Sequence, residues 1–271
     1  MCIRDRDFLA GVRKLESFGF NFSGKPFLKK LPTVSEKIKE FNRLISDPQI
    51  KMLLALRGGY GSIKLLGGID FGLIRKNPKI IAGFSDLTAL LNVIYEKTGV
   101  VTFHTPMVLN FAKATSFTVH SFLNAVNGFD EKNLFAGAKI ETLKNGISSG
   151  VLKGGNLITI TSLIGTPWEI NFKGAIVFLE EVDEKLHSAD RCLTHLALAK
   201  KFKDVRGLVI GNFRGIKTSD VFGILKELMR VDFPVVHTPN IGHVRDKISL
   251  PVGAKVRLDT YKKELTILQR F

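Results

Sequence analysis

Two spacings of apolar residues alternate along the first hundred positions of the chain, one typical of amphipathic helices and the other of buried strands. Apolar side chains recur every three or four residues over 8–18 and over Ser35–Ile45, which predicts helices there. Short apolar runs between the helical segments predict buried strands. This alternation indicates a parallel, doubly wound sheet. The predicted strands are 50–56, 80–84 and 100–103, and two further helices are predicted to begin at 63 and to span 86–97.

The pattern weakens after about residue 112. Polar stretches and two Asn-Gly pairs make residues 113–149 read as a linker that carries one helix near 119–126. We therefore expect an N-terminal domain over 1–112 and a C-terminal domain over 150–271, and Gly154-Gly155-Asn156 reads as a turn where the second domain begins. Strands of that domain are predicted at 175–179, 207–210, 235–237 and 255–259, with helices at 190–201 and 219–229.

Composition points to an ordinary globular protein of 271 residues, 45% of them hydrophobic. No apolar run approaches the ~20 residues that a membrane span needs, and the start, Met1 to Asp7, lacks the apolar stretch of a secretion signal. Cys2 and Cys192 form neither a disulfide framework nor a paired metal-ligand spacing. We expect a cytoplasmic protein with no membrane contact and no metal.

The net charge is strongly positive, with 40 Lys and Arg against 25 Asp and Glu, or +15. Such a charge suggests nucleic-acid binding through phosphate neutralisation. The basic residues are spread along the chain, however, and no basic run is interleaved with stacking aromatic residues, so we expect no nucleic-acid partner. The positive field would instead concentrate a small anionic substrate in a cleft.

Ser85 lies where the predicted strand 80–84 turns into a helix, and this is the position of the serine in a nucleophile elbow. Gly83 fits the pattern of that elbow, whereas Leu87 stands where a second glycine is usual. The backbone N–H of Asp86 would then be available to a developing oxyanion. The alternative is that Ser85 caps the helix that follows.

A serine nucleophile requires a base and a carboxylate that orients the base. His243 is the candidate base, because it lies in a glycine-flanked loop after a strand, although a loop histidine is often only a surface residue. Glu180 and Glu181, directly after the predicted strand 175–179, are the candidate carboxylates, although charges commonly mark the solvent boundary of a strand. His104 follows a strand and is expected to line the same cleft, while His120, His187 and His195 read as structural.

A glycine-rich loop, Arg57-Gly58-Gly59-Tyr60-Gly61, follows the predicted strand 50–56. Its glycines allow backbone N–H groups to approach an anion or an oxyanion. The loop lacks the Gly-Lys-Ser/Thr of a phosphate loop, and the Gly-x-Gly-x-x-Gly fingerprint of dinucleotide sites is absent from it. The loop therefore reads as neither a phosphate loop nor a dinucleotide-binding turn.

Six segments taken in order resemble the LD-carboxypeptidases, a family of serine peptidases that includes muramoyltetrapeptide carboxypeptidases and microcin C self-immunity proteins. The resemblance implies an α/β fold with an N-terminal Rossmann-like parallel-sheet domain and a smaller C-terminal β-rich domain. It also implies a homodimer that needs no metal or other cofactor. The matching segments are Leu56–Gly61, Gly83–Thr88, Thr102–His104, Gly154–Leu157, Phe178–Glu181 and Ile241–His243.

The family pattern implies a role for each candidate residue. Ser85 would be the nucleophile, His243 the general base, and Glu180 rather than Glu181 the orienting carboxylate, since the family keeps the first acid after the strand. Oxyanion donors would map to the backbone of Asp86 and of the Gly58-Gly59 turn. Further candidates for contact with the substrate are Arg57, His104, Gly155 and Asn156.

The implied reaction removes the terminal D-alanine from murein tetrapeptides during cell-wall recycling in the cytoplasm. One alternative is a microcin-type immunity hydrolase that cleaves acyl-aminoacyl-nucleotide amides, and another is a truncated remnant that binds peptides without cleaving them. Two departures bear on these alternatives. The first strand and Pro-Ser turn of the family are missing before Phe8, and Thr105 replaces a more usual glycine, where it would narrow the cleft or alter a turn.

Overall fold

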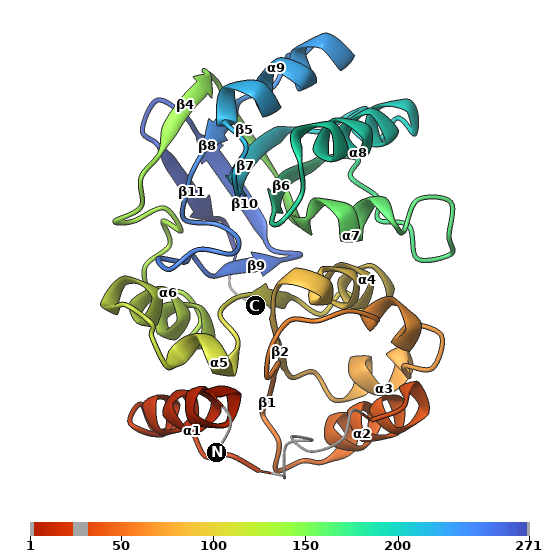
Figure 1. The fold of residues 1–271 in the computed structure, drawn as a ribbon, viewed down its shortest axis with the longest axis vertical. Helices are drawn as coiled ribbons and strands as arrows, with labels where there is room; N and C mark the ends of the chain where they lie inside the picture. Colours follow the sequence, from red (N-terminus) through yellow and green to blue (C-terminus); the bar gives the residue numbers. More distant parts are fainter. Residues whose placement is uncertain (1–2, 24–31, 270–271) are drawn as a thin grey trace.

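A computed structural model describes residues 3–23 and 32–269 of the chain. It contains two sheets, one in each half of the molecule, which follow one another along its long axis (Figure 1). The α/β class predicted from the sequence is confirmed. No helix in the described ranges combines the length and apolar character needed to cross a membrane.

The N-terminal sheet has the strand order β1-β2-β3-β9. Strands β1 (Met52–Leu54), β2 (Ile80–Gly83) and β3 (Thr102–His104) are parallel, as the alternation of strands and helices predicted. Strand β9 (Leu250–Val252) comes from the distant end of the chain and pairs antiparallel with β3. The C-terminal half therefore completes the sheet of the N-terminal half.

Helices cover this sheet and connect its strands. The most buried is α4 (Thr88–Thr98), whose residues 88–94 are all buried because the helix lies between the two halves of the molecule (Figure 1). The predicted helix 8–18 corresponds to α1 (Ile3–Glu16), which packs against α5. The remaining elements are α2 (Val34–Ser46), the 3-10 turns η1 (Ser62–Leu65) and η2 (Ser85–Leu87), α3 (Phe71–Lys76), α5 (Val108–Phe111) and α6 (Ser116–Val126).

The C-terminal sheet is the wider of the two, with seven strands against four in the described residues. Its order is β11-β10-β5-β6-β7-β8-β4, and the central strands β5 to β8 are parallel. Every residue of β6 is buried, which explains its continuous apolar run. The strands are β4 (Glu141–Lys144), β5 (Ile147–Asn156), β6 (Ala175–Glu181), β7 (Gly207–Phe213), β8 (Val235–His237), β10 (Lys255–Asp259) and β11 (Glu264–Ile267), and the helices are α7 (Leu157–Thr161), α8 (Leu186–Leu198) and α9 (Thr218–Leu228).

Two details of the predicted organisation differ from the structure. Residues 113–149 hold the predicted helix, as α6, but also strand β4, which pairs with β8 in the C-terminal sheet. Gly154-Gly155-Asn156 is the end of β5 rather than a turn. Glycine is needed there because a Cβ on Gly154 would lie 1.9 Å from the Phe178 carbonyl oxygen of the neighbouring strand.

The edge of the N-terminal sheet is β1, which pairs only with β2 among the described strands. Helix α1 buries Leu15 against Phe111 and Phe122 of the segment that follows β3. The apolar face of this helix is therefore covered, as its sequence pattern requires.

Gly253, between β9 and β10, sets how closely the two halves of the molecule meet. Its φ is +99°, and a Cβ there would lie 2.1 Å from the ring of Tyr95 on α4. We expect Gly253→Ala to lower the free energy of unfolding by about 2–4 kcal/mol, since it combines a left-handed backbone with overpacking. Urea titration measures this, with Gly223→Ala as the control because nothing lies within 4 Å of a Cβ at Gly223 in α9. Equal stability of the two variants would contradict close contact at Gly253.

Candidate active site

Ser85 occupies a strained turn between β2 and α4. Its φ is +67°, a left-handed conformation that costs a residue with a side chain about 1–3 kcal/mol. The sharp turn from strand to helix is the backbone of a nucleophile elbow. The alternative role, an N-cap, is not what the structure shows, because the Ser85 hydroxyl meets a histidine and caps neither η2 nor α4. The strained turn therefore directs the Ser85 hydroxyl toward His243.

The loop 57–62 is tied to this elbow through Asp86. The backbone N–H of Ser62 donates to Asp86 Oδ2 at 2.8 Å, and the Ser62 hydroxyl donates to the Asp86 carbonyl oxygen. The Asp86 side chain is therefore engaged by the loop, and only its backbone N–H is a candidate oxyanion donor.

A chain of two hydrogen bonds joins the two halves of the molecule at Ser85. His243 Nε2 lies 3.0 Å from Ser85 Oγ, and His243 Nδ1 lies 2.9 Å from Glu180 Oε2. The arrangement fixes the tautomer, since Nδ1–H donates to the carboxylate and Nε2 is left to accept the serine proton. Glu180 is fully buried, whereas the His243 side chain is 23% exposed. This is the geometry of a nucleophile, a base and an orienting carboxylate.

Glu180 and Glu181 are the last two residues of β6 rather than residues after it, so their side chains point to opposite faces of the sheet. Glu180 reaches His243, whereas Glu181 accepts hydrogen bonds from Asn156 Nδ2 and from the backbone N–H of Ile158 and Val182, at 2.8–2.9 Å. Burial raises the pKa of Glu181. Because side chains alternate along β6, Glu180 points toward His243 and Glu181 points toward the start of α7.

Gly242 allows the histidine loop to approach Glu180. Its φ is +110°, and a Cβ there would lie 2.6 Å from Glu180 Oε2. The loop is closed by two backbone bonds, from Val244 N–H to the Gly242 carbonyl at 2.9 Å and from Ile248 N–H to the Asn240 carbonyl at 2.8 Å. The glycine flanking His243 in the sequence is therefore required by the close approach.

The predicted glycine loop lies beside the nucleophile. A Cβ on Gly58 would lie 3.3 Å from Ser85 Oγ, so this part of the backbone is near the place where an oxyanion would develop. Gly59 and Arg57 are exposed, and the Arg57 guanidinium donates to the Gly58 carbonyl at 2.8 Å. A contact between Arg57 and the substrate stays a prediction.

His104 does not line the open cleft as predicted, because it is buried beneath the elbow. Its ring packs edge-on against Phe84 and Phe178, with centroids 5.7 and 5.1 Å away. Burial lowers the pKa of His104 to about 4, so the ring is neutral, and neither ring nitrogen has a hydrogen-bond partner among the described residues. Thr105 is also buried and pairs with Ser249 Oγ at 2.8 Å, so it does not narrow the cleft.

The other two glycine-motif candidates have clear packing roles. Asn156 is buried, and its amide joins Glu181 while its Oδ1 accepts the Thr159 N–H at 3.1 Å, which caps α7. A Cβ on Gly155 would lie 2.4 Å from Thr88 Oγ1, so this glycine lets α4 pack against β5. A substrate contact by either residue stays a prediction.

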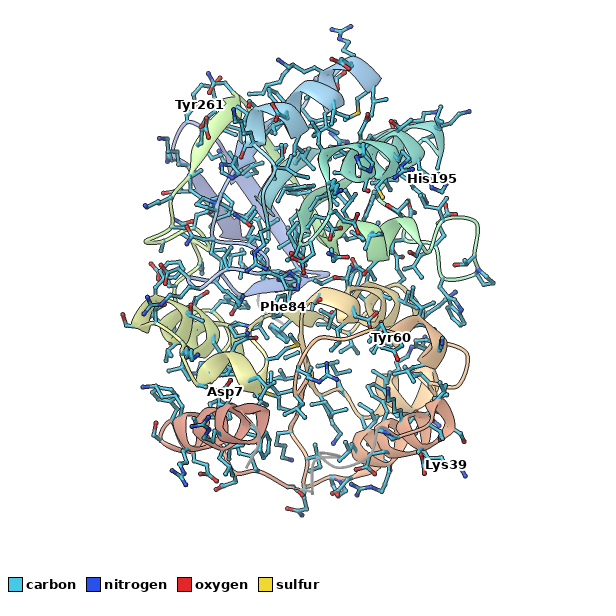
Figure 2. The ribbon with its side chains drawn as sticks, viewed as in Figure 1. Asp7, Lys39, Tyr60, Phe84, His195 and Tyr261 are labelled. Atoms are coloured by element: carbon cyan, nitrogen blue, oxygen red, sulfur yellow. The ribbon has the colours of Figure 1, made fainter. Side chains whose placement is uncertain are left out.

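The remaining histidines lie away from Ser85 or pair elsewhere. His195 lies on α8, in the outer part of the C-terminal half (Figure 2). His120 lies 3.3 Å from Glu131, and His237 lies 3.4 Å from Glu141 across the β8–β4 pair. In the part of the chain that the structure describes, no three His, Cys, Asp or Glu side chains are grouped as metal ligands.

A groove begins beside the histidine loop and runs along α5 and the start of α6. It has a volume of about 710 Å³, and its lining includes two exposed cationic side chains, Lys113 and Arg245, and one buried lysine, Lys247. No motif in the sequence singles out these residues, although two of them follow His243 within four positions. The other lining residues are Leu109, Asn110, Ala114, Thr118 and Val244.

The chain resembles known proteins over nearly its whole length. Residues 2–105 match the LD-carboxypeptidase N-terminal domain, and residues 149–258 match the LD-carboxypeptidase C-terminal domain. A probable murein peptide carboxypeptidase of Bacillus subtilis (strain 168) is 31% identical over 242 residues, which are 86% of this chain and 76% of that protein. The microcin C7 self-immunity protein MccF of Escherichia coli is 28% identical over 307 residues, covering 97% of this chain and 88% of MccF.

The fold is also similar to solved structures of an MccF-like protein and of a muramoyltetrapeptide carboxypeptidase. An MccF-like protein from Bacillus anthracis str. Ames has a TM-score of 0.86 and 27% identity, covering 97% of this chain and 91% of that one. A muramoyltetrapeptide carboxypeptidase from Oxalobacter formigenes has a TM-score of 0.83 and 26% identity, covering 97% of this chain and 94% of that one.

Proposed function

Since the chain belongs to the LD-carboxypeptidase family, we propose that it is a serine carboxypeptidase that hydrolyses the LD-peptide bond before the terminal D-alanine of murein tetrapeptides. The observation that carries this proposal is the pair of hydrogen bonds from Ser85 through His243 to Glu180, at 3.0 and 2.9 Å. These bonds give a serine hydroxyl both a base and a group that orients the base.

In the first half of the reaction, Ser85 Oγ attacks the carbonyl carbon at the L-centre of the diamino acid while its proton passes to His243 Nε2. The buried carboxylate of Glu180 stabilises the imidazolium that forms. The negative charge on the substrate oxygen is met by the backbone N–H of Asp86 and by the Gly58-Gly59 turn. The intermediate then collapses, and the proton on His243 leaves with the amine of D-alanine.

In the second half, His243 takes a proton from water, which attacks the acyl-enzyme and releases the tripeptide. Ser85 recovers its proton and the cycle closes. The serine comes from the N-terminal half, and the histidine and glutamate come from the C-terminal half. The distance between Ser85 Oγ and His243 Nε2 therefore depends on how firmly the two halves are held together.

The direct test is incubation of the purified protein with a murein tetrapeptide, followed by mass spectrometry. We expect loss of one alanine and appearance of the tripeptide. A parallel assay offers an acyl-aminoacyl-nucleotide amide, the substrate of the alternative immunity function. Preferential cleavage of that amide would replace the proposed substrate, and binding of the tetrapeptide without any hydrolysis would identify a binding protein instead of an enzyme.

The cationic groove supports a substrate rich in carboxylates. Lys113 and Arg245 are exposed at its rim, next to the histidine loop. We expect the double variant K113A/R245A to raise KM for the tetrapeptide roughly tenfold, about 1.4 kcal/mol, with kcat nearly unchanged, because exposed charges mainly capture the substrate. Steady-state kinetics at two salt concentrations checks this, since the wild-type advantage should shrink as salt screens the charges. An unchanged KM at low salt would argue against binding in this groove.

The family resemblance also implies a homodimer and a place in peptidoglycan recycling in the cytoplasm. Both remain predictions. Sedimentation of the purified protein measures the oligomeric state directly.

A further inference from the structure

Lys247 is a buried lysine inside the loop that carries the catalytic base. It is only 6% exposed, and its Nζ donates to the carbonyl oxygens of Gly242 and Val244, at 2.9 and 2.5 Å. These two carbonyls belong to the residues on either side of His243. The ammonium group thus spans the loop from within and fixes the backbone before and after the base.

The same ammonium group contacts the nucleophile elbow. Lys247 Nζ lies 4.4 Å from the centroid of the Phe84 ring, a cation–π distance. Phe84 directly precedes Ser85, and its ring also packs against the imidazole of His243, with centroids 4.7 Å apart. Figure 2 shows Phe84 at the level where the two halves meet. One side chain therefore links the residue before the nucleophile to the loop of the base.

A third element, helix α6, holds the backbone of Lys247. Its backbone N–H donates to Thr118 Oγ1 on α6 at 2.9 Å, and the Thr118 hydroxyl donates to the Arg245 carbonyl at 2.9 Å. The ammonium group is directed inward from this fixed point. The packing of the loop against α6 therefore fixes the position of the ammonium group, which is not a mobile group at the surface.

A buried ammonium group is unfavourable unless its contacts compensate for lost hydration. Burial lowers the pKa of Lys247 to about 8, while Glu180 acts in the opposite direction. The charged or titratable groups around it are Glu180 on β6, His104 on β3, His243, Arg245 and Asp246 in its own loop, and Lys113 across the groove. A methionine would fill the same space without this cost.

We propose that Lys247 is a positioning residue for the hydrolysis, and that its charged amine holds the loop of His243 in register with the Ser85 elbow. The inference rests on the proposed function, because it assigns His243 as the base. Lys247 touches neither the substrate nor the reacting atoms. It acts through the two carbonyls beside the base and through the ring beside the nucleophile.

The test compares Lys247→Met with Lys153→Met. Lys153 is a matched control because it is 7% exposed, lies 2.7 Å from Glu96 and 5.5 Å from the Tyr95 ring, and does not contact the proposed triad. We expect Lys247→Met to lower kcat by roughly 10- to 100-fold with KM changed less than threefold, the pattern of a lost transition-state geometry. Lys153→Met is expected to keep kcat per folded molecule even where its melting temperature falls.

The pH profile separates positioning by charge from simple packing. Lys247 is charged below a pH of about 8 and neutral above it, so wild-type kcat should fall as pH rises through that value. Lys247→Arg stays charged over the whole range. It should retain more activity than Lys247→Met, and its alkaline limb should be absent. Normal kcat in Lys247→Met, or an unchanged alkaline limb in both variants, would overturn the proposal.

A second measurement keeps this inference separate from the substrate assignment. The rate at which a fluorophosphonate labels Ser85, located by peptide mass spectrometry, reports activation of the nucleophile without any murein peptide. If the wild-type protein is labelled but does not cleave tetrapeptides, the proposed function fails while the comparison of labelling rates still tests Lys247. Equal labelling rates for the wild-type protein and Lys247→Met would overturn the positioning role.

Discussion

Replacing Ser85 with alanine is expected to lower kcat for tetrapeptide hydrolysis by roughly 10⁴- to 10⁶-fold, because the variant has no atom to form the acyl-enzyme. Substrate binding should be little changed, since the glycine loop and the cationic groove remain. Turnover measured by release of D-alanine, together with isothermal titration of the tetrapeptide, checks both expectations. Ser162→Ala, on an exposed serine after α7, is the control and should retain full activity.

The strained backbone of Ser85 also predicts a difference in stability between two inactive variants. At φ +67° alanine suffers the same strain as serine, whereas glycine does not. Ser85→Gly should therefore be as inactive as Ser85→Ala but more stable than it, by about 1–2 kcal/mol. Denaturant titration of the two inactive proteins measures the difference. Near-normal turnover in either variant would exclude Ser85 as the nucleophile, and equal stability would mean that the elbow is not strained.

Glu180→Gln is expected to lower kcat by about 10²- to 10⁴-fold, because an amide can neither hold the required tautomer of His243 nor stabilise its protonated form. The carboxylate is fully buried and lies 2.9 Å from His243 Nδ1, so solvent offers no substitute. Single-turnover kinetics measures the loss in the acylation step, while KM should change little.

Glu181→Gln is the matched control, since it makes the same change one residue along β6. Its oxygens accept three hydrogen bonds from Asn156, Ile158 and Val182, and an amide nitrogen in place of either oxygen would face a donor instead of accepting from it. We expect a loss of stability of about 1–3 kcal/mol with kcat nearly unchanged. If the two variants lose activity equally, Glu180 is not the specific partner of the base.

The sequence was sufficient to find the residues that the structure brings together as a candidate site. The turn from strand to helix at Ser85 and the glycine beside His243 are local signals, because each reflects a backbone conformation that few residues adopt. Residue identity alone could not separate Glu180 from Glu181. The separation follows from the fact that β6 extends through both residues, two positions beyond its predicted end.

What the sequence did not predict depends on contacts between distant segments. His104 was expected in the cleft because it ends a strand, but its burial depends on Phe84 above it and on Phe178 from the other sheet. Lys247 was one more basic residue among forty, and only the folded loop gives its amine two carbonyls and a ring. Strands β4 and β9 were not predicted, because β4 lies within the polar segment 113–149 and β9 contains Pro251, which argues against a strand.

Strand β9 has a consequence for the order in which the protein is made. Thr102 of β3 pairs with Val252 of β9, so this partner leaves the ribosome about 150 residues after β3 does. The sheet beneath Ser85 cannot be completed while the chain is still being synthesised up to that point, and His243 itself comes only shortly before it. A nascent chain that has already exposed Ser85 therefore still lacks His243, the proposed base. Hydrolytic capacity arises in a late step of folding, when the last strand of the N-terminal sheet is added.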